Sequence, residues 1–216
     1  MTKTVGTNGP VNGSEIINNL IRGAEGACKE YIGLSGNPFP GSAPESFVQA
    51  GAARGLKKLV PTCVVLEEPV ARTYKAAQPP KRGPLNKNVA RGRYDITVYW
   101  KNGNPRAAVE VKSPVNALSK AKYLKDFNRL IQTMRGHKAA TFQYGIFLFL
   151  TVKKNERSNF NQAISQIDAL TEKLKNRADD LCKPSIRAVK YDGESHEICH
   201  ENIKGAWRIS AIVFRR

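Results

Sequence analysis

Apolar positions along the chain follow two spacings, one typical of helices and one typical of strands. In four segments apolar residues recur every three or four positions, which predicts amphipathic helices. These helices are expected over residues 14–34, 45–59, 117–136 and 158–178. In six other segments apolar residues alternate with polar ones or form short runs, which predicts strands. The strands are expected over residues 62–70, 94–100, 106–114, 144–152, 185–191 and 206–214.

Residues between these segments support their boundaries. Ser14 is a suitable cap for the first helix, and Pro44 suits the first turn of the second. Asn102-Gly103 separates two predicted strands, and this dipeptide is the strongest short signal for a tight hairpin. The predicted fold class is therefore α/β, with a central mixed β-sheet that has an antiparallel hairpin at its core and helices on its flanks.

The length and composition of the chain fit a single domain. We expect one core over residues 14–216, preceded by a polar, Gly-rich and flexible tail at residues 1–13. The longest apolar run, residues 144–152, is too short to span a bilayer, so no membrane partner is expected. The four cysteines lie far apart without a CxxC pair, which fits a reducing cytoplasm.

Positive charge is the feature of the composition that points to a partner. The chain has 35 Lys and Arg against 18 Asp and Glu, and a net charge of +17 attracts polyanions such as nucleic acid. Residues 71–93 hold seven Lys or Arg and no acid, and they are too rich in Pro and Gly for a simple connector. The candidate phosphate contacts, from this segment and the following helix, are Lys75, Lys81, Arg82, Lys87, Arg91, Arg93, Lys120 and Lys122. The charges on the helix would also suit a solvated face.

Three charged residues of the predicted hairpin carry candidate chemistry. Alternation places Asp95 opposite to the face of Tyr94 and Ile96, and it places Glu110 and Lys112 on one common face. If the register brings Asp95 to that face, two carboxylates meet and a hard cation such as Mg²⁺ would relieve their repulsion. Such an ion orients a phosphate and lowers the pKa of a bound water. A lysine beside it can position or deprotonate that water, or stabilise charge on phosphorus.

This constellation resembles the PD-(D/E)XK, or restriction endonuclease-like, nuclease superfamily. The match is Asp95, then fourteen residues, then Glu110-Val111-Lys112, within a helix–strand–hairpin–helix–strand order over residues 45–152. Tyr94 stands where the proline of the motif would be, and that proline is often replaced in the family.

The resemblance implies a Mg²⁺-dependent nuclease acting on double-stranded DNA, of restriction or phage type, with Mn²⁺ as a substitute ion. It implies that Asp95, Glu110 and the main-chain carbonyl of Val111 bind the metal and that Lys112 serves the nucleophile. An additional acid from the preceding helix is expected, with Glu45 as the best candidate, and cleavage of both strands would favour a homodimer. Further candidates to complete the site are Glu67 or Glu68 in the first strand and Gln132 in the helix after the hairpin.

Two other interpretations remain open for these charges. Glu110 and Lys112 could form an exposed cross-strand ion pair on a solvated sheet face. The chain could also be a basic nucleic-acid-binding protein on the same fold that does not cut.

The segment His196-Glu-Ile-Cys-His200 spells the HExxH motif of zinc peptidases. That motif needs a helix, whereas a turn-like segment precedes it here and a glycine follows. As a strand, it would place His196 and His200 on one face and Glu197 on the other, which does not suit peptidase geometry. A structural zinc held by Cys199 and the histidines is a variant of the same idea.

Overall fold

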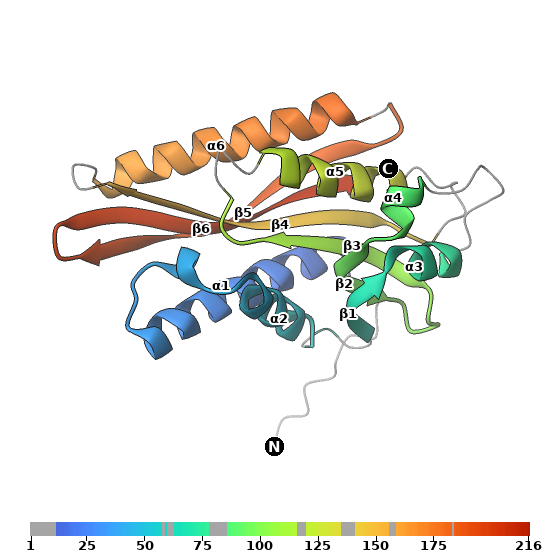
Figure 1. Cartoon of the computed structure of the whole chain (residues 1–216), viewed down its shortest axis with the longest axis horizontal. Helices are drawn as coiled ribbons and strands as arrows, with labels where there is room; N and C mark the ends of the chain where they lie inside the picture. Colours follow the sequence, from blue (N-terminus) through green and yellow to red (C-terminus); the bar gives the residue numbers. More distant parts are fainter. Residues whose placement is uncertain are drawn as a thin grey trace, which may run out of the picture.

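The computed structural model describes residues 12–57, 59, 63–77, 86–115, 120–134, 141–155, 159–182 and 184–216. They form one six-stranded sheet in the order β1-β2-β3-β4-β6-β5, with helices on both faces (Figure 1). The strands are β1 (Cys63–Pro69), β2 (Arg93–Tyr99), β3 (Pro105–Lys112), β4 (Tyr144–Asn155), β5 (Arg187–His200) and β6 (Ile203–Arg215). The helices are α1 (Gly13–Ser35), α2 (Glu45–Leu56), α3 (Val70–Ala76), α4 (Lys87–Ala90), α5 (Lys120–Met134) and α6 (Phe160–Leu181), with a 3-10 turn η1 (Pro40–Ser42). The predicted α/β class with a mixed sheet is confirmed.

Strand β3 lies between β2 and β4 in the sheet. β1, β2 and β3 form an antiparallel meander, and β3 then pairs with β4 in parallel. A parallel pair needs a crossover, and α5 lies within the connection between the two strands. The β2–β3 hairpin turns at Gly103, whose φ of 78° is the left-handed conformation that glycine adopts at little cost. The predicted hairpin is therefore confirmed.

Two apolar cores lie on the two faces of the sheet. α1 and α2 cover one face, and α5 and α6 cover the other (Figure 1). Val109 and Val111 of β3 pack in the α1/α2 core, whereas Ala108 packs in the α5 core. Glu110 is in phase with Ala108 along the strand, so it points towards α5.

The α2 helix lies unusually close to α1 because glycines line their crossing. A Cβ added to Gly55 would lie 2.1 Å from the carbonyl oxygen of Asn19, and one added to Gly23 would lie 2.4 Å from that of Gly51. No larger residue fits these positions without moving a backbone. This close packing fixes α2 against the sheet, with Glu45 in its first turn.

Three local predictions differ from the structure. The cap of α1 is Asn12, not Ser14: the Asn12 side chain accepts from the Ser14 N–H, and Glu15 accepts from the Asn12 N–H. This is a capping box, in which each side chain satisfies an otherwise unpaired amide. No helix was predicted for the basic segment 71–93, whereas α3 overlaps its start and α4 lies within it. The two last strands are longer than predicted and form one hairpin, because polar residues continue along the edge strand β5.

The face of Tyr94 was also predicted wrongly. Tyr94 packs in the α5 core and its hydroxyl hydrogen-bonds Thr133, whereas Ile96 lies in the α1/α2 core. β2 therefore changes face at Asp95. On β1, Leu66 pairs with Ile96 and Glu68 pairs with Tyr94. Glu67, between these two paired residues, has a φ of 54°. A positive φ in a residue other than glycine marks a local break in the strand.

Among the described helices, none combines the length and the apolar character needed to cross a bilayer.

Candidate active site

Glu45 and Gln49 project from one face of α2 because they are one helical turn apart. The Glu45 carboxylate accepts from Lys112 Nζ at 3.0 Å through Oε1 and from the Ser113 N–H at 3.2 Å through Oε2. Gln49 Nε2 donates to the main-chain oxygen of Asp95 at 2.6 Å and to Glu67 Oε1 at 2.9 Å. Side chains from the first turns of α2 thus hydrogen-bond both to the end of β3 and to the irregular positions Glu67 of β1 and Asp95 of β2.

Asp95 lies where β2 and β3 diverge. The pairing between these strands begins at Ile96 and Val109, so no ladder connects Asp95 to Glu110. The Asp95 carboxylate instead accepts from the Val111 N–H at 2.5 Å. Its charge also interacts with those of Lys112 and Glu110, which places all three predicted residues in one cluster.

Glu110 is buried against α5 and is only 1% exposed. Its Oε1 accepts from Arg129 Nη1 at 2.6 Å, and the same nitrogen donates to the Arg93 carbonyl at 3.0 Å. The interpretation of Glu110 and Lys112 as a solvated ion pair is therefore wrong, because Glu110 is buried and pairs with Arg129 instead. The Arg129 guanidinium occupies the position beside Glu110 that a metal cation could otherwise occupy.

Lys112 lies between acids from both layers of helices. Its ammonium contacts Glu45, lies 3.7 Å from Asp126 Oδ2 of α5, and donates to the Val111 carbonyl at 2.9 Å. Asp126 is also 3.8 Å from Arg129 Nη1. Five carboxyl groups, those of Glu45, Glu67, Asp95, Glu110 and Asp126, thus surround two cationic groups, Lys112 and Arg129. The cluster therefore contains more carboxyl groups than cationic groups.

Burial disfavours the charged form of three of these acids. Desolvation raises the pKa of Asp95 to about 6, although the Val111 N–H and Lys112 oppose the shift. Desolvation also raises the pKa of Glu110 well above its usual value, against the opposing effect of Arg129, and it raises that of Asp126. For Lys112, burial favours the neutral amine, but Asp126 and Glu45 outweigh it and raise the pKa. Lys112 is therefore a positive charge in a cluster where carboxyl groups outnumber cationic groups.

No known protein family, curated protein or solved structure matches the chain.

The arrangement of the oxygen atoms can be compared with the needs of a divalent cation. Mg²⁺ prefers carboxylate and carbonyl oxygens, which Asp95, Glu110 and Val111 offer. In the described part of the chain, no three Asp, Glu, His or Cys side chains are gathered closely enough to hold a metal. Each of these three oxygen groups already accepts a hydrogen bond from a protein donor. Asp95 accepts from the Val111 N–H, Glu110 accepts from Arg129, and the Val111 carbonyl accepts from Lys112. These residues fit the ion in chemical type, and binding would require Glu110 to exchange Arg129 for the metal.

The other candidates for completing the site fall into two groups. Glu67 lies at the cluster through Gln49, whereas Glu68 is buried and pairs with Arg72 at 3.3 Å. Gln132 is half-buried in α5, and its side chain makes no hydrogen bond to the cluster within the described residues. Sequence reasoning missed Gln49, Asp126 and Arg129. Their only signal was spacing, four residues after Glu45 for the first and three residues apart on one helix for the other two.

The structure describes the side chains of four of the eight predicted phosphate contacts. All four are exposed on or beside α3, α4 and the start of β2, and they belong to Lys75, Lys87, Arg91 and Arg93. Lys81 and Arg82 lie outside the described residues, and the side chains of Lys120 and Lys122 are not described either.

The HExxH segment lies within strand β5, so the helix that a zinc peptidase needs is not formed. The His196 ring stacks on Trp207 with centroids 4.1 Å apart, while Glu197 is exposed. Both histidines contact aromatic rings, since His200 lies 6.5 Å from the Phe39 ring. These contacts favour a packing role for the histidines.

Proposed function

We propose that the chain is a Mg²⁺-dependent deoxyribonuclease of the PD-(D/E)XK type that hydrolyses DNA phosphodiester bonds. The observation that carries this proposal is the cluster of Asp95, Glu110, Lys112 and Glu45 at the C-terminal end of β3, with more carboxyls than cations. The order α2, β1, β2, β3, α5, β4, with α3 and α4 between β1 and β2 and with β3 parallel to β4, agrees with a restriction endonuclease-like core.

Asp95, Glu110 and the Val111 carbonyl would hold the ion, with Glu45 completing its surroundings. When bound, Mg²⁺, or Mn²⁺ in its place, would stabilise charge on the phosphate and lower the pKa of a water. Lys112 is expected to remain protonated, because Asp126 and Glu45 raise its pKa. Its ammonium therefore orients the attacking water and stabilises charge on the phosphoryl oxygens, and it does not act as the base. Arg129, once it leaves Glu110, becomes a second positive group for the phosphate.

A hollow beside Arg129 supports contact with a nucleic-acid backbone. It has a volume of about 370 Å³ and lies between α4 and α5, with Asn88, Lys125 and Asn128 among its lining residues. Exposed Lys87 and Arg91 belong to the same region. Amide and cationic side chains of this kind bind phosphates without reading sequence.

Cleavage of both DNA strands would suit a homodimer, which we include in the proposal together with a cytoplasmic location. All four cysteines, Cys28, Cys63, Cys182 and Cys199, are free, as expected for a reducing compartment.

The test is incubation of the purified protein with supercoiled plasmid in Mg²⁺ or in EDTA. We expect nicked or linear plasmid in Mg²⁺ and intact plasmid in EDTA. Lys112→Ala should lose cleavage by a factor on the order of 10² or more, because one charged group aimed at the reacting phosphate is removed. Lys190→Ala is the matched control, since Lys190 of β5 pairs with Glu172 of α6 and Asp192 of β5, away from the cluster. Equal cleavage by the wild type and Lys112→Ala would contradict the proposed role of the lysine.

One observation favours a second candidate, a nucleic-acid-binding protein that does not cut. Glu110 is already neutralised by Arg129, so the cluster can persist as a structural ion-pair network without metal. Tight plasmid binding in a mobility-shift assay, with no cleavage in Mg²⁺ or Mn²⁺, would favour this candidate over the nuclease.

A further inference from the structure

A second pocket lies at the opposite end of the central strands from the carboxylate cluster. Its volume is about 530 Å³, within the range usual for small-ligand sites. Tyr144 lines it and pairs with Ala107, five residues before Lys112 on β3. At roughly 3.3 Å per residue, the pocket lies about 17 Å from Lys112 along the strand. It is therefore a separate site.

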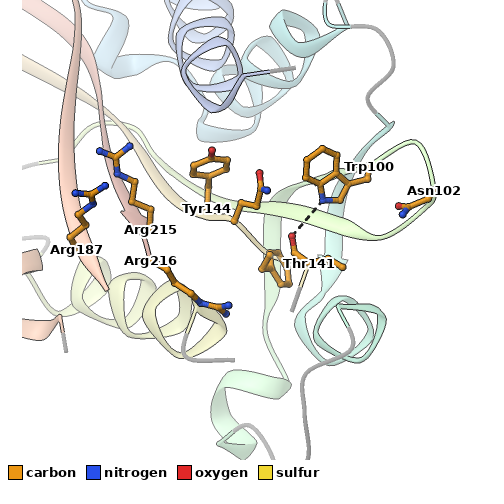
Figure 2. Close-up of a pocket in the computed structure, with 9 residues that line it drawn as sticks. Trp100, Asn102, Thr141, Tyr144, Arg187, Arg215 and Arg216 are labelled. Carbon is orange, nitrogen blue, oxygen red and sulfur yellow. Dashed lines mark hydrogen bonds between the residues drawn. The ribbon is translucent and has the colours of Figure 1, made fainter. Parts of the chain in front are cut away.

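Arg187 and Arg215 lie together on one side of this pocket, whereas the side chain of Arg216 extends in another direction (Figure 2). Arg187 of β5 and Arg215 of β6 are directly opposite each other in the strand register, and Arg216 follows. Like charges directly opposite on antiparallel strands destabilise the pair. None of the described residues that line the pocket is acidic. Among these lining residues, no acidic side chain thus compensates the repulsion between Arg187 and Arg215.

The state of Arg187 and Arg215 agrees with a missing anion. Within the described residues, Arg187 and Arg215 take part in no ion pair, and the buried Nε of Arg215 has no hydrogen-bond partner. Arg216 Nε donates to the Met134 carbonyl at 2.9 Å, which fixes the direction of its guanidinium group. Two neighbouring guanidinium groups such as those of Arg187 and Arg215 form a strong site for a phosphate, because each can donate two parallel hydrogen bonds.

Aromatic rings line the other side of the same pocket. Trp100, directly after β2, donates from Nε1 to the Thr141 carbonyl at 3.5 Å (Figure 2). The Arg106 guanidinium lies 4.0 Å from the centroid of the Trp100 ring. Tyr144 lies between Trp100 and the arginines in Figure 2. Flat rings beside cationic groups are the combination that binds a nucleobase together with its phosphate.

We propose that this pocket binds one nucleotide unit, with its phosphate on Arg187 and Arg215 and its base against Trp100 and Tyr144. The unit is either a free mononucleotide or the phosphorylated end of a nucleic-acid strand. Both sources share the same chemistry, and neither requires the nuclease site to be active.

The test is isothermal titration calorimetry in EDTA with adenosine 5′-monophosphate, adenosine and inorganic phosphate. We expect the nucleotide to bind at least about tenfold more tightly than adenosine or phosphate, because it uses both halves of the pocket. Arg215→Gln and the exposed Arg187→Gln should each weaken nucleotide binding by about tenfold, while Arg177→Gln, from a surface pair on α6, should not change it. Trp100→Ala should weaken binding of the nucleotide but not of phosphate.

Oligonucleotides with and without a 5′-phosphate distinguish the two sources. Tighter binding of the phosphorylated than of the unphosphorylated oligonucleotide assigns the pocket to a strand end, and equal binding of the two oligonucleotides together with binding of the mononucleotide assigns it to a free nucleotide. The proposal is overturned if the nucleotide does not bind, if phosphate alone binds as tightly, or if both arginine variants bind normally. Because EDTA is present throughout, these outcomes are independent of Mg²⁺-dependent cleavage.

Discussion

Glu110→Gln should lower Mg²⁺-dependent plasmid cleavage by a factor on the order of 10³, with little change in folding. The glutamine keeps the shape of the side chain but lacks the negative charge that a divalent cation needs. The fold should tolerate it because burial already disfavours the Glu110 carboxylate, as its raised pKa indicates. Arg129 keeps the Arg93 carbonyl and Asp126 as partners in this variant. Initial rates of plasmid nicking, together with circular dichroism, measure both effects.

Glu68→Gln is the matched control for this variant. Glu68 is also a buried strand carboxylate and it also pairs with an arginine, Arg72, but it lies outside the cluster. Its substitution should leave the rate of cleavage unchanged. If Glu110→Gln cuts plasmid at the rate of the wild type, Glu110 is not a metal ligand for this reaction.

Arg129→Gln should destabilise the protein in EDTA by about 3–5 kcal/mol, because Glu110 is then buried without a cationic partner. For a chain of this length, that loss corresponds to a fall in Tm of roughly 6–20 °C. Addition of Mg²⁺ should raise the Tm of the variant more than that of the wild type, because the released carboxylate gains the metal. Thermal denaturation with EDTA and with Mg²⁺ measures both changes.

The pH dependence of the Arg129→Gln variant provides a check on the cause. The pKa of Glu110 is raised in the folded state, so protonation favours folding and stability is gained as pH falls through that pKa. The deficit of the variant should therefore shrink in mildly acidic solution. Combining Glu110→Gln with Arg129→Gln in one protein should restore most of the stability, because no uncompensated buried charge remains.

Arg54→Gln is the corresponding control, since Arg54 forms an exposed pair with Glu30 and such pairs contribute little. An Arg129→Gln variant as stable as the wild type in EDTA would show that Glu110 does not depend on this guanidinium. Equal stabilisation of both proteins by Mg²⁺ would show that the metal does not compete for the same position.

Regular stretches of the chain were predictable from the sequence. β3 keeps strict alternation, so the common face of Glu110 and Lys112 follows from their spacing. The β2–β3 hairpin follows from Asn102-Gly103, whose turn geometry is local. The helix stripes are likewise local, and the observed α1, α2, α5 and α6 agree with them within a few residues.

The position of Asp95 could not be predicted, because it depends on an irregularity without a sequence signal. β2 changes face at Asp95, beside Glu67 with its positive φ, and neither residue is a glycine. Alternation counted through such a break assigns Tyr94 to the wrong core. Only this break brings the Asp95 carboxylate to the Val111 amide.

Partners from α5 were equally hidden in the sequence. Arg129 appeared as one more basic residue on a helix with several, yet its guanidinium lies on Glu110. Helical spacing shows that Asp126 and Arg129 share a side of α5, but their contacts depend on where the crossover places that helix. The length of the β5–β6 hairpin was missed for a related reason, because an edge strand exposed to solvent carries polar residues that resemble a loop.

Crystals grown with Mn²⁺ test the central claim most directly, because anomalous scattering locates the ion without reference to activity. The account predicts one strong peak within about 2.0–2.3 Å of oxygens from Asp95, Glu110 and the Val111 carbonyl, with Arg129 displaced from Glu110. A structure in which Arg129 still holds Glu110, and no peak lies between the two carboxylates, would contradict it.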